Sequence, residues 1–223
     1  MTNHNLSRKS RKYRRERDAG KIIIYTEGNV TEPEYLNNWI DEYAKQHNIN
    51  KIKAHTKFKV EPSHDKSEPM KVVDSLIQSQ PNYEDVDSFY AVFDEDDRCH
   101  SGKVKTNFVN AIQKAEKNNI KVICSNRSVE LWALLHFEDA KPIDDCSDKL
   151  KTYMPEYDAS RNKRFDVAKM LKDDNQEKAK ERAKKLRKSN IVEGRKWYDR
   201  PSTNFDELIE AMENKIKVEN PQK

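Results

Sequence analysis

The chain has few of the residues on which several common site types depend. Only four glycines occur in 223 residues, and neither a P-loop nor a Gly-x-Gly-x-x-Gly dinucleotide-binding motif is present. Its three cysteines, Cys99, Cys124 and Cys146, are far apart and lack Cys-x-x-Cys spacing. This pattern argues against a disulfide framework or a structural zinc site, and it favours a reducing, cytoplasmic location.

Long apolar runs are also missing. No run approaches the length of about eighteen residues that a membrane-spanning helix needs, so we expect no membrane span. The N-terminus has no apolar core after its charges and is therefore not expected to be a secretory signal. Charged residues make up 37% of the chain and apolar residues 35%, but the apolar residues are concentrated in short runs (IIIY, FYAVF, KVIC, LWALLHF). This concentration favours a compact core over disorder.

Positive charge is gathered in residues 1–20, which we interpret as a basic N-terminal arm. Residues 1–21 carry eight basic and two acidic groups, so the rest of the chain has a net charge of about −2 (+4 less +6). The basic residues of the arm are Arg8, Lys9, Arg11, Lys12, Arg14, Arg15 and Arg17. The arm can bind the phosphates of nucleic acid with release of counterions, or it can be a solubilising tail, and its composition leaves both readings open.

Strand-like and helix-like signals alternate over residues 21–140, which we predict to form one domain. The predicted strands are Lys21–Thr26, Ile52–Val60, Ser88–Phe93 and Lys121–Cys124. The predicted helices start at a capping box formed by Thr31 and Glu34, cover Met70–Gln78 and Asn107–Lys117, and follow the fourth strand in VELWALLHF. This alternation predicts an α/β fold with an open, mostly parallel four-stranded sheet flanked by helices.

Strand signals stop after Glu138. We expect residues 141–223 to form a mostly helical C-terminal extension packed on the same domain. A long charged helix is predicted over 164–190, and a final helix is predicted after a cap at Thr203-Asn204-Phe205-Asp206.

Acidic residues follow two of the predicted strands. Glu27 comes directly after the first strand, and Asp94, Asp96 and Asp97 follow the third. In open α/β sheets, ligands bind in the crevice outside the carboxyl ends of the strands. Carboxylate oxygens are the ligands that Mg²⁺ and Mn²⁺ prefer, so we predict a divalent-metal site formed by Glu27, Asp94 and Asp96.

The acidic loop has three other interpretations. An EF-hand loop would need an oxygen ligand and a glycine where Arg98 and Cys99 stand, so that reading fails. Phosphotransferases with an aspartyl nucleophile usually carry Asp-x-Asp after the first strand, whereas here it follows the third. The remaining alternative is that the acids are solvated turn residues.

Two further titratable residues, Glu130 and His136, follow the fourth strand. Glu130 precedes an apolar helix start, where it either interacts with the helix dipole or serves as a further metal ligand. His136 lies on the same apolar helix, and we expect a hydrogen-bonded core residue there rather than a catalytic base.

The stretches KIIIYTEGNVTEPEYL, YAVFDEDD and VICSNRSVELWALLHFED together resemble the RloB-like family of phage-defence proteins, which belongs to the broader Toprim group. The resemblance covers about residues 8–140, and the late segment RPSTNFDEL is also similar to that family. It implies a Toprim-like fold with a glutamate after the first strand and Asp-x-Asp after the third. It further implies a second acid near the first, at Glu32, and a Ser-x-Glu motif at Ser128 and Glu130.

This resemblance implies a Mg²⁺- or Mn²⁺-dependent nuclease of abortive-infection defence, with RNA such as tRNA favoured over DNA and an ATPase as partner. The family often has a proline where Arg127 stands. We also consider a non-catalytic module that binds nucleic acid or a partner, and an enzyme acting on small nucleotides. Whether the chain forms a homo-oligomer stays open.

Overall fold

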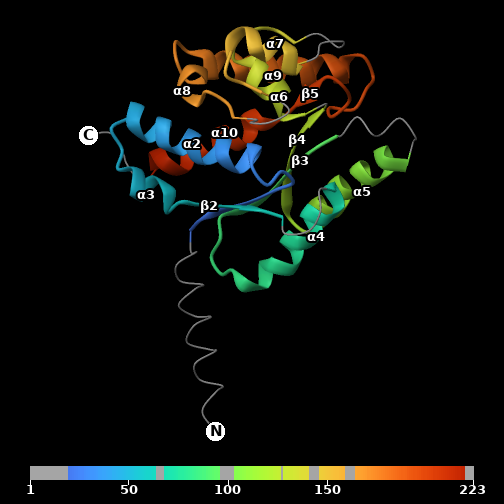
Figure 1. The fold of residues 1–223 in the computed structure, drawn as a ribbon. Coiled ribbons are helices and arrows are strands. Elements are labelled where there is room, and N and C mark those ends of the chain that lie inside the picture. The colour runs from blue at the N-terminus through green and yellow to red at the C-terminus, as the bar shows by residue number, and fades with distance from the viewer. Residues whose placement is uncertain are drawn as a thin grey trace.

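The computed structural model describes residues 20–63, 68–95, 103–126, 128–140, 146–158 and 164–218. Within these residues one sheet is flanked by helices on both faces (Figure 1). Its strands are β1 (Ile22–Thr26), β2 (Phe58–Pro62), β3 (Ser88–Asp94), β4 (Ile120–Asn126) and β5 (Ser202–Thr203). The α-helices are α2 (Thr31–Gln46), α3 (Lys51–His55), α4 (Pro69–Ser79), α5 (Lys103–Lys117), α6 (Val129–Leu135), α7 (Cys146–Tyr153), α8 (Val167–Met170), α9 (Asn175–Val192) and α10 (Phe205–Val218), and a 3₁₀ turn spans Gln80–Asn82.

The strand order is β2-β1-β3-β4-β5, and all pairs are parallel except the last. The α/β class and the mostly parallel sheet are therefore confirmed, but the prediction of four strands is wrong by one. The additional strand, β5, has only two residues, and it pairs antiparallel with β4 through Ser125 and Thr203. Two residues cannot show an apolar alternation, so the sequence pattern missed this strand.

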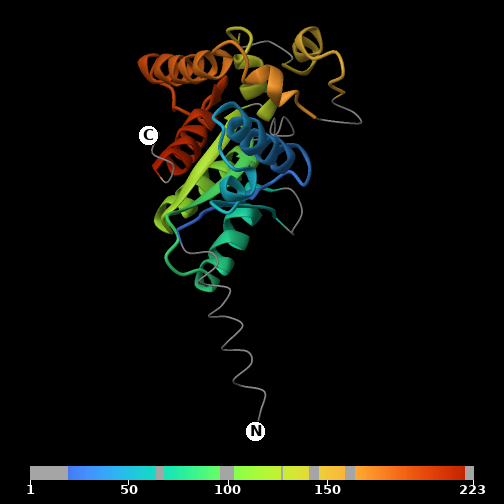
Figure 2. The same ribbon diagram turned by 90° about the vertical axis from the view of Figure 1, so that its left-hand side faces the viewer.

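The core lies on both faces of the sheet because successive side chains of a strand point to opposite faces. Ile24 of β1 faces a cluster with Trp39 of α2 and Phe205 of α10. Ile23 faces a second cluster with Leu76 of α4 and Phe108 of α5. Helices α2 and α10 thus cover one face and helices α4 and α5 the other, as Figures 1 and 2 show. A strand covered on both faces explains the continuous apolar run of β1.

The predicted strand Ile52–Val60 is wrong in its first half. Residues Lys51–His55 form the short helix α3, and β2 begins only at Phe58. The Asn50 side chain accepts a hydrogen bond from the backbone N–H of Lys53 at 2.9 Å. This cap starts a helical turn in a stretch whose alternating pattern resembles a strand.

The capping box at the start of α2 is also corrected. Thr31 is the first helical residue, and the cap position belongs to Val30, which makes no side-chain capping bond. The Glu34 carboxylate pairs with Arg164 at 2.8 Å and does not reach back to the helix start. An ion pair with a residue far along the chain therefore replaces the local bond that the motif predicts.

The single helix predicted over 164–190 is divided into α8 and α9. Asp173 and Asp174 between them have φ angles of 51° and 61°, a left-handed conformation that interrupts a helix. Helix α9 then packs its small side chains, Ala179 and Ala183, into the core shared with α2 and α10. One core cluster thus contains residues from both 21–140 and 141–223.

Candidate metal centre

Three parallel strands bring their carboxyl ends to the same edge of the sheet. Glu27 directly follows β1, Asp94 is the last residue of β3, and Glu130 lies in the first turn of α6, just after β4. Helices α6, α7 and α9 lie at this end of the sheet (Figure 1). The edge is the crevice in which ligands of open α/β sheets are bound.

Glu27 and Asp94 are in direct contact. The backbone N–H of Asp94 donates a hydrogen bond to Oε2 of Glu27 at 3.0 Å. The backbone N–H of Glu27 in turn donates to the carbonyl of Val92 at 2.8 Å. The end of β1 is therefore bound to β3 by a main-chain and a side-chain hydrogen bond, and the Glu27 carboxylate lies at the end of β3.

The Asp94 carboxylate connects β3 to helix α6. Its Oδ2 accepts a hydrogen bond from the backbone N–H of Val129 at 3.0 Å. Val129 is the first residue of α6, where backbone N–H groups have no partner within the helix. Ser128 occupies the cap position, partly buried, and makes no side-chain capping bond, so the Asp94 side chain takes over part of that role.

Glu32 lies against the turn between β1 and α2. It is in the first turn of α2 and only 5% exposed. A Cβ atom added at Gly28 would lie 1.9 Å from Oε2 of Glu32, so this carboxylate approaches the backbone of Gly28 more closely than a side chain there would permit. The TEGNVTE segment therefore needs its glycine to make room for the carboxylate.

Glu130 is 3% exposed, and Oε1 of its carboxylate accepts a hydrogen bond from the hydroxyl of Tyr157 at 2.7 Å. The Tyr157 ring stacks on Phe165, with centroids 5.6 Å apart. The sequence analysis missed Tyr157, because it lies in a stretch without periodicity or motif. Glu130 is therefore a buried carboxylate that a hydrogen bond holds in place, and not a surface acid.

Four carboxylates influence one another at this edge. Desolvation raises the pKa of Asp94 well above its ordinary value, and the negative charges of Glu32, Glu130 and Glu27 raise it further. The hydrogen bond from Val129 N–H opposes these effects in part. Asp94 as a whole is only partly buried, yet its carboxyl group is enclosed closely enough for desolvation to be the largest cause. A cation among these groups would relieve the repulsion.

The donor set suits a hard divalent cation, since every member is a carboxylate. In the part of the chain that the structure describes, however, no three His, Cys, Asp or Glu side chains are close enough together to hold a metal ion. Asp94, Glu27 and Glu130 already bind protein donors there. Asp96 and Asp97, which were predicted to belong to the site, lie outside the described residues. The four carboxylates thus fit a divalent ion by their chemistry, although their oxygens are not gathered into a coordination shell.

Asn126 and Glu95 form a neighbouring polar contact that the sequence analysis missed. Nδ2 of Asn126 donates to the Glu95 carboxylate and to the carbonyl of Tyr198, the latter at 3.0 Å. Asn126 is the last residue of β4, so a polar residue at the carboxyl end of a buried strand was a usable signal. The contact joins the acidic loop to the segment that follows α9.

The remaining candidates divide in two groups. His136 is fully buried and its Nδ1 is 3.0 Å from the carbonyl of Trp132, so the prediction of a hydrogen-bonded core residue is confirmed. The basic residues of the arm lie outside the described residues, namely Arg8, Lys9, Arg11, Lys12, Arg14, Arg15 and Arg17. None of the described helices is long and apolar enough to cross a membrane.

A family model described as RloB-like protein matches residues 22–212. This match covers the whole sheet, the carboxylates at its edge and most of α10. No curated protein and no solved structure gives a significant match.

Proposed function

Because the chain belongs to the RloB-like protein family, we propose that it is a Mg²⁺- or Mn²⁺-dependent nuclease with a Toprim-like fold that hydrolyses phosphodiester bonds of nucleic acid. The resemblance noted in the sequence favours RNA, including tRNA, as the substrate and abortive-infection defence as the setting. It also favours an ATPase as partner.

The observation that carries this proposal is the group of carboxylates around Asp94. Glu27, Glu32 and Glu130 come from different turns and helices, and their charges all raise the pKa of Asp94. A stable fold gains nothing from placing four acids together, because like charges at short range are unfavourable. Such an arrangement is expected where a divalent cation is part of the working site.

In the proposed site, Asp94, Asp96 and Glu130 would hold the metal ion, and Glu32 would add a further carboxylate oxygen. Bound divalent ions stabilise the charge that develops on the attacking and leaving oxygens in phosphodiester hydrolysis. Glu27 would either bind a second ion or act as general base, taking a proton from the attacking water.

The chain's own contacts prepare these groups for their roles. The hydrogen bond from Asp94 N–H fixes Oε2 of Glu27 at the end of β3. The Val129 N–H orients the Asp94 carboxylate. Tyr157 holds Glu130 and is thus a positioning residue. The basic arm would bind the phosphate backbone of the substrate, an interaction that weakens with rising salt.

The test is a cleavage assay with Asp94→Asn and Glu27→Gln. Purified protein is incubated with total cellular RNA and with plasmid, in Mn²⁺ and in EDTA, and the ends of any products are mapped. We expect both variants to lose at least about 100-fold in metal-dependent cleavage. Glu34→Gln is the matched control, because Glu34 lies on α2 two residues after Glu32 but pairs with Arg164. Full activity in Asp94→Asn would end the proposal.

A second candidate is a non-catalytic module that binds nucleic acid or a partner protein. It is favoured by the hydrogen bonds that already occupy Glu27, Asp94 and Glu130, since carboxylates with protein donors can serve the fold alone. Calorimetric titration with Mn²⁺ separates the two candidates. A binding module would keep its nucleic-acid affinity in Asp94→Asn and would never cut the strand.

A further inference from the structure

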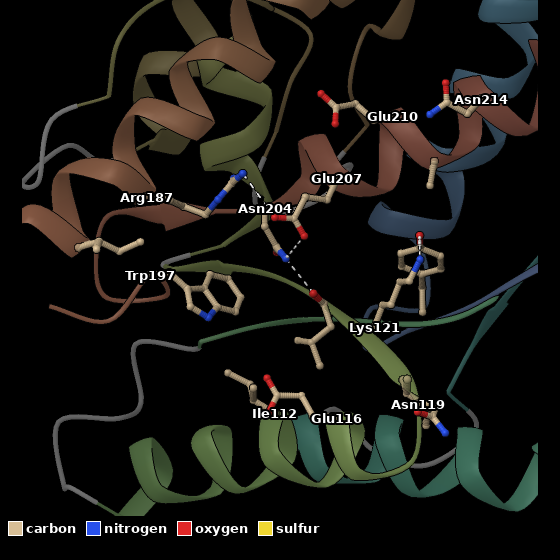
Figure 3. A pocket seen from close by; sticks show the side chains of 15 residues that line it. Ile112, Glu116, Asn119, Lys121, Arg187, Trp197, Asn204, Glu207, Glu210 and Asn214 are labelled. Atoms are coloured by element: carbon tan, nitrogen blue, oxygen red, sulfur yellow. Dashed lines mark hydrogen bonds and ion pairs between the residues drawn. The ribbon is translucent and has the colours of Figure 1, made fainter.

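A groove of about 1010 Å³ lies on the opposite side of β4 from β3 (Figure 3). Helix α5 forms one wall through Ile112 and Glu116, and helix α10 forms the other through Glu207 and Glu210. The floor is the first half of β4, including Ile120. This groove is separate from the carboxylates, which lie beyond the carboxyl end of the sheet.

The floor of the groove is an open sheet edge. Strand β5 pairs with β4 only at Ser125 and Asn126, so Ile120 to Val122 have no strand neighbour on that side among the described residues. Residues of a strand direct their backbone groups alternately to the two sides. Val122 O and Cys124 N point to the groove side, where the Asn204 side chain binds them. The N–H of Val122 and both backbone groups of Ile120 therefore also face the groove.

Asn204 already imitates an added strand. Its Oδ1 accepts from Cys124 N–H and its Nδ2 donates to Val122 O, both at 2.8 Å. Its own backbone N–H donates to Cys124 O at 3.3 Å. One amide thus continues the line of β5 by a single residue (Figure 3). Beyond Asn204, the N–H of Val122 and the N–H and C=O of Ile120 are spaced to pair with a further strand.

The walls of the groove are apolar at the base and carry charged side chains of both signs at the rim. Ile191, with 59% of its surface exposed, and Trp197 offer apolar contact at the end near β5. Glu116 and Glu207 are exposed on opposite walls.

Arg187 also lines the groove, where its Nη atoms bind the buried carboxylate of Asp206 and one of them lies 3.5 Å from Glu207. Glu210 pairs with Lys184 at 2.6 Å, and Lys121 lines the groove as well. Among the described residues, Glu116 is therefore the acid of these walls that has no ion pair.

We propose that this groove binds an extended peptide segment of another protein, which adds a strand to the edge of β4 and places a Lys or Arg side chain against Glu116. Main-chain hydrogen bonds to a sheet edge supply affinity in such complexes, and alternate side chains supply specificity. The unpaired, exposed carboxylate of Glu116 favours positive charge in the segment at that wall. A second copy of the same surface does not fit, because two concave faces cannot fill each other.

The test uses a fluorescently labelled short peptide in which valine and lysine alternate, titrated with the full chain, and a matched peptide with glutamate in place of lysine. We expect the lysine peptide to bind at least about ten-fold more tightly. Val122→Pro removes the backbone N–H that Val122 directs into the groove. This variant should bind the lysine peptide at least about ten-fold more weakly. Glu116→Lys combined with Glu210→Lys should do the same, whereas Glu181→Lys, on the exposed side of α9, should stay within about two-fold.

Thermal melting of each variant shows whether it is folded. If Val122→Pro is unfolded, the double variant Glu116→Lys with Glu210→Lys still decides the test. Equal binding of the two peptides, or binding that the groove variants leave unchanged, would overturn the proposal.

The source of the segment is tested with Arg14→Gln, Arg15→Gln and Arg17→Gln combined. If the peptide binds this variant more tightly than it binds the wild type, the chain's own N-terminal arm occupies the groove, and the assignment to another protein is wrong. A change of oligomeric state in Glu116→Lys with Glu210→Lys would assign the groove to a second copy instead.

Discussion

The carboxylate of Glu27 accepts a hydrogen bond from the backbone N–H of Asp94 at 3.0 Å, although 67 positions separate the two residues in the chain. The contact ties the group after β1 to the backbone from which the acidic loop starts. A change at Glu27 therefore alters the support of Asp94 as well as the charge of the site. For this reason Asp94 is the cleaner position at which to test charge alone.

We predict that Asp94→Asn stabilises the metal-free protein near pH 7. The raised pKa of Asp94 means that the folded state holds a proton that the unfolded chain has released. Above the ordinary aspartate pKa of about 3.9, stability therefore falls as the pH rises toward the raised value. Asparagine keeps an oxygen for Val129 N–H without this charge, so its Tm should exceed that of the wild type by about 2–4 °C.

Melting curves between pH 4 and 8, measured in EDTA, check this prediction, and the difference in Tm should shrink as the pH falls. Adding Mn²⁺ should raise the Tm of the wild type and leave that of Asp94→Asn unchanged, because only the former would bind the ion. A lower Tm for Asp94→Asn at every pH would show that the acid serves the fold.

We predict that Gly28→Ala displaces the Glu32 carboxylate. The new methyl group would lie 1.9 Å from Oε2 of Glu32, so the buried side chain must move. Unfolding in urea should show a loss of about 1–3 kcal/mol. In a Glu32→Ala background the same change should cost less than about 0.5 kcal/mol, because the clash is gone. Equal losses in both backgrounds would mean that the backbone of Gly28, and not the carboxylate, sets the cost.

We predict that His136 makes the protein sensitive to acid. Desolvation lowers the pKa of His136 to about 3, the nearby charges of Arg182 and Lys180 contribute to this, and its Nε2 has no partner among the described residues. The unfolded chain takes up a proton below about pH 6.5, whereas the folded state takes it up only near pH 3. Stability should therefore fall with decreasing pH between these values, by up to about 1.4 kcal/mol per pH unit.

His136→Phe removes this titration. Urea unfolding at pH 7, 6, 5 and 4 should give a shallower dependence on pH for the variant than for the wild type. Parallel slopes in the two proteins would show that His136 is not the group responsible.

We predict that Asn204→Ala destabilises the protein by about 2–4 kcal/mol. It removes two buried hydrogen bonds to β4 and leaves Cys124 N–H and Val122 O unsatisfied. The control is Asn37→Ala, which removes one exposed hydrogen bond to Pro33 O and should cost less than about 1 kcal/mol. Denaturant unfolding of both variants decides the comparison. A loss at Asn204 no larger than that at Asn37 would contradict the strand-like role.

The parts of the fold with strong local patterns could be predicted from the sequence. The apolar runs of β1, β3 and β4 marked buried strands, and the acids after the first two marked the edge at which Glu27 and Asp94 meet. Periodicity carries this information because burial on one or both faces dictates it.

Contacts between distant segments could not be predicted in the same way. Strand β5 has only two residues, and the role of Asn204 depends on hydrogen bonds to residues about eighty positions earlier. Tyr157 reaches Glu130 from a stretch without any pattern. The break before α9 rests on two aspartates in a left-handed conformation, which a charge pattern does not reveal. These features depend on tertiary contacts, and a single sequence does not record them.

The distance along the chain between β4 and the residues that pair with it has a consequence for biosynthesis. A ribosome releases the first four strands well before residues 202–216, which complete the sheet and supply Phe205 and Ile209 to one of its two cores. A growing chain therefore lacks these contacts to β4 until about eighty further residues have been added after that strand. The carboxylates at the ends of β1 and β3 thus sit on a sheet whose last pairing forms late in synthesis.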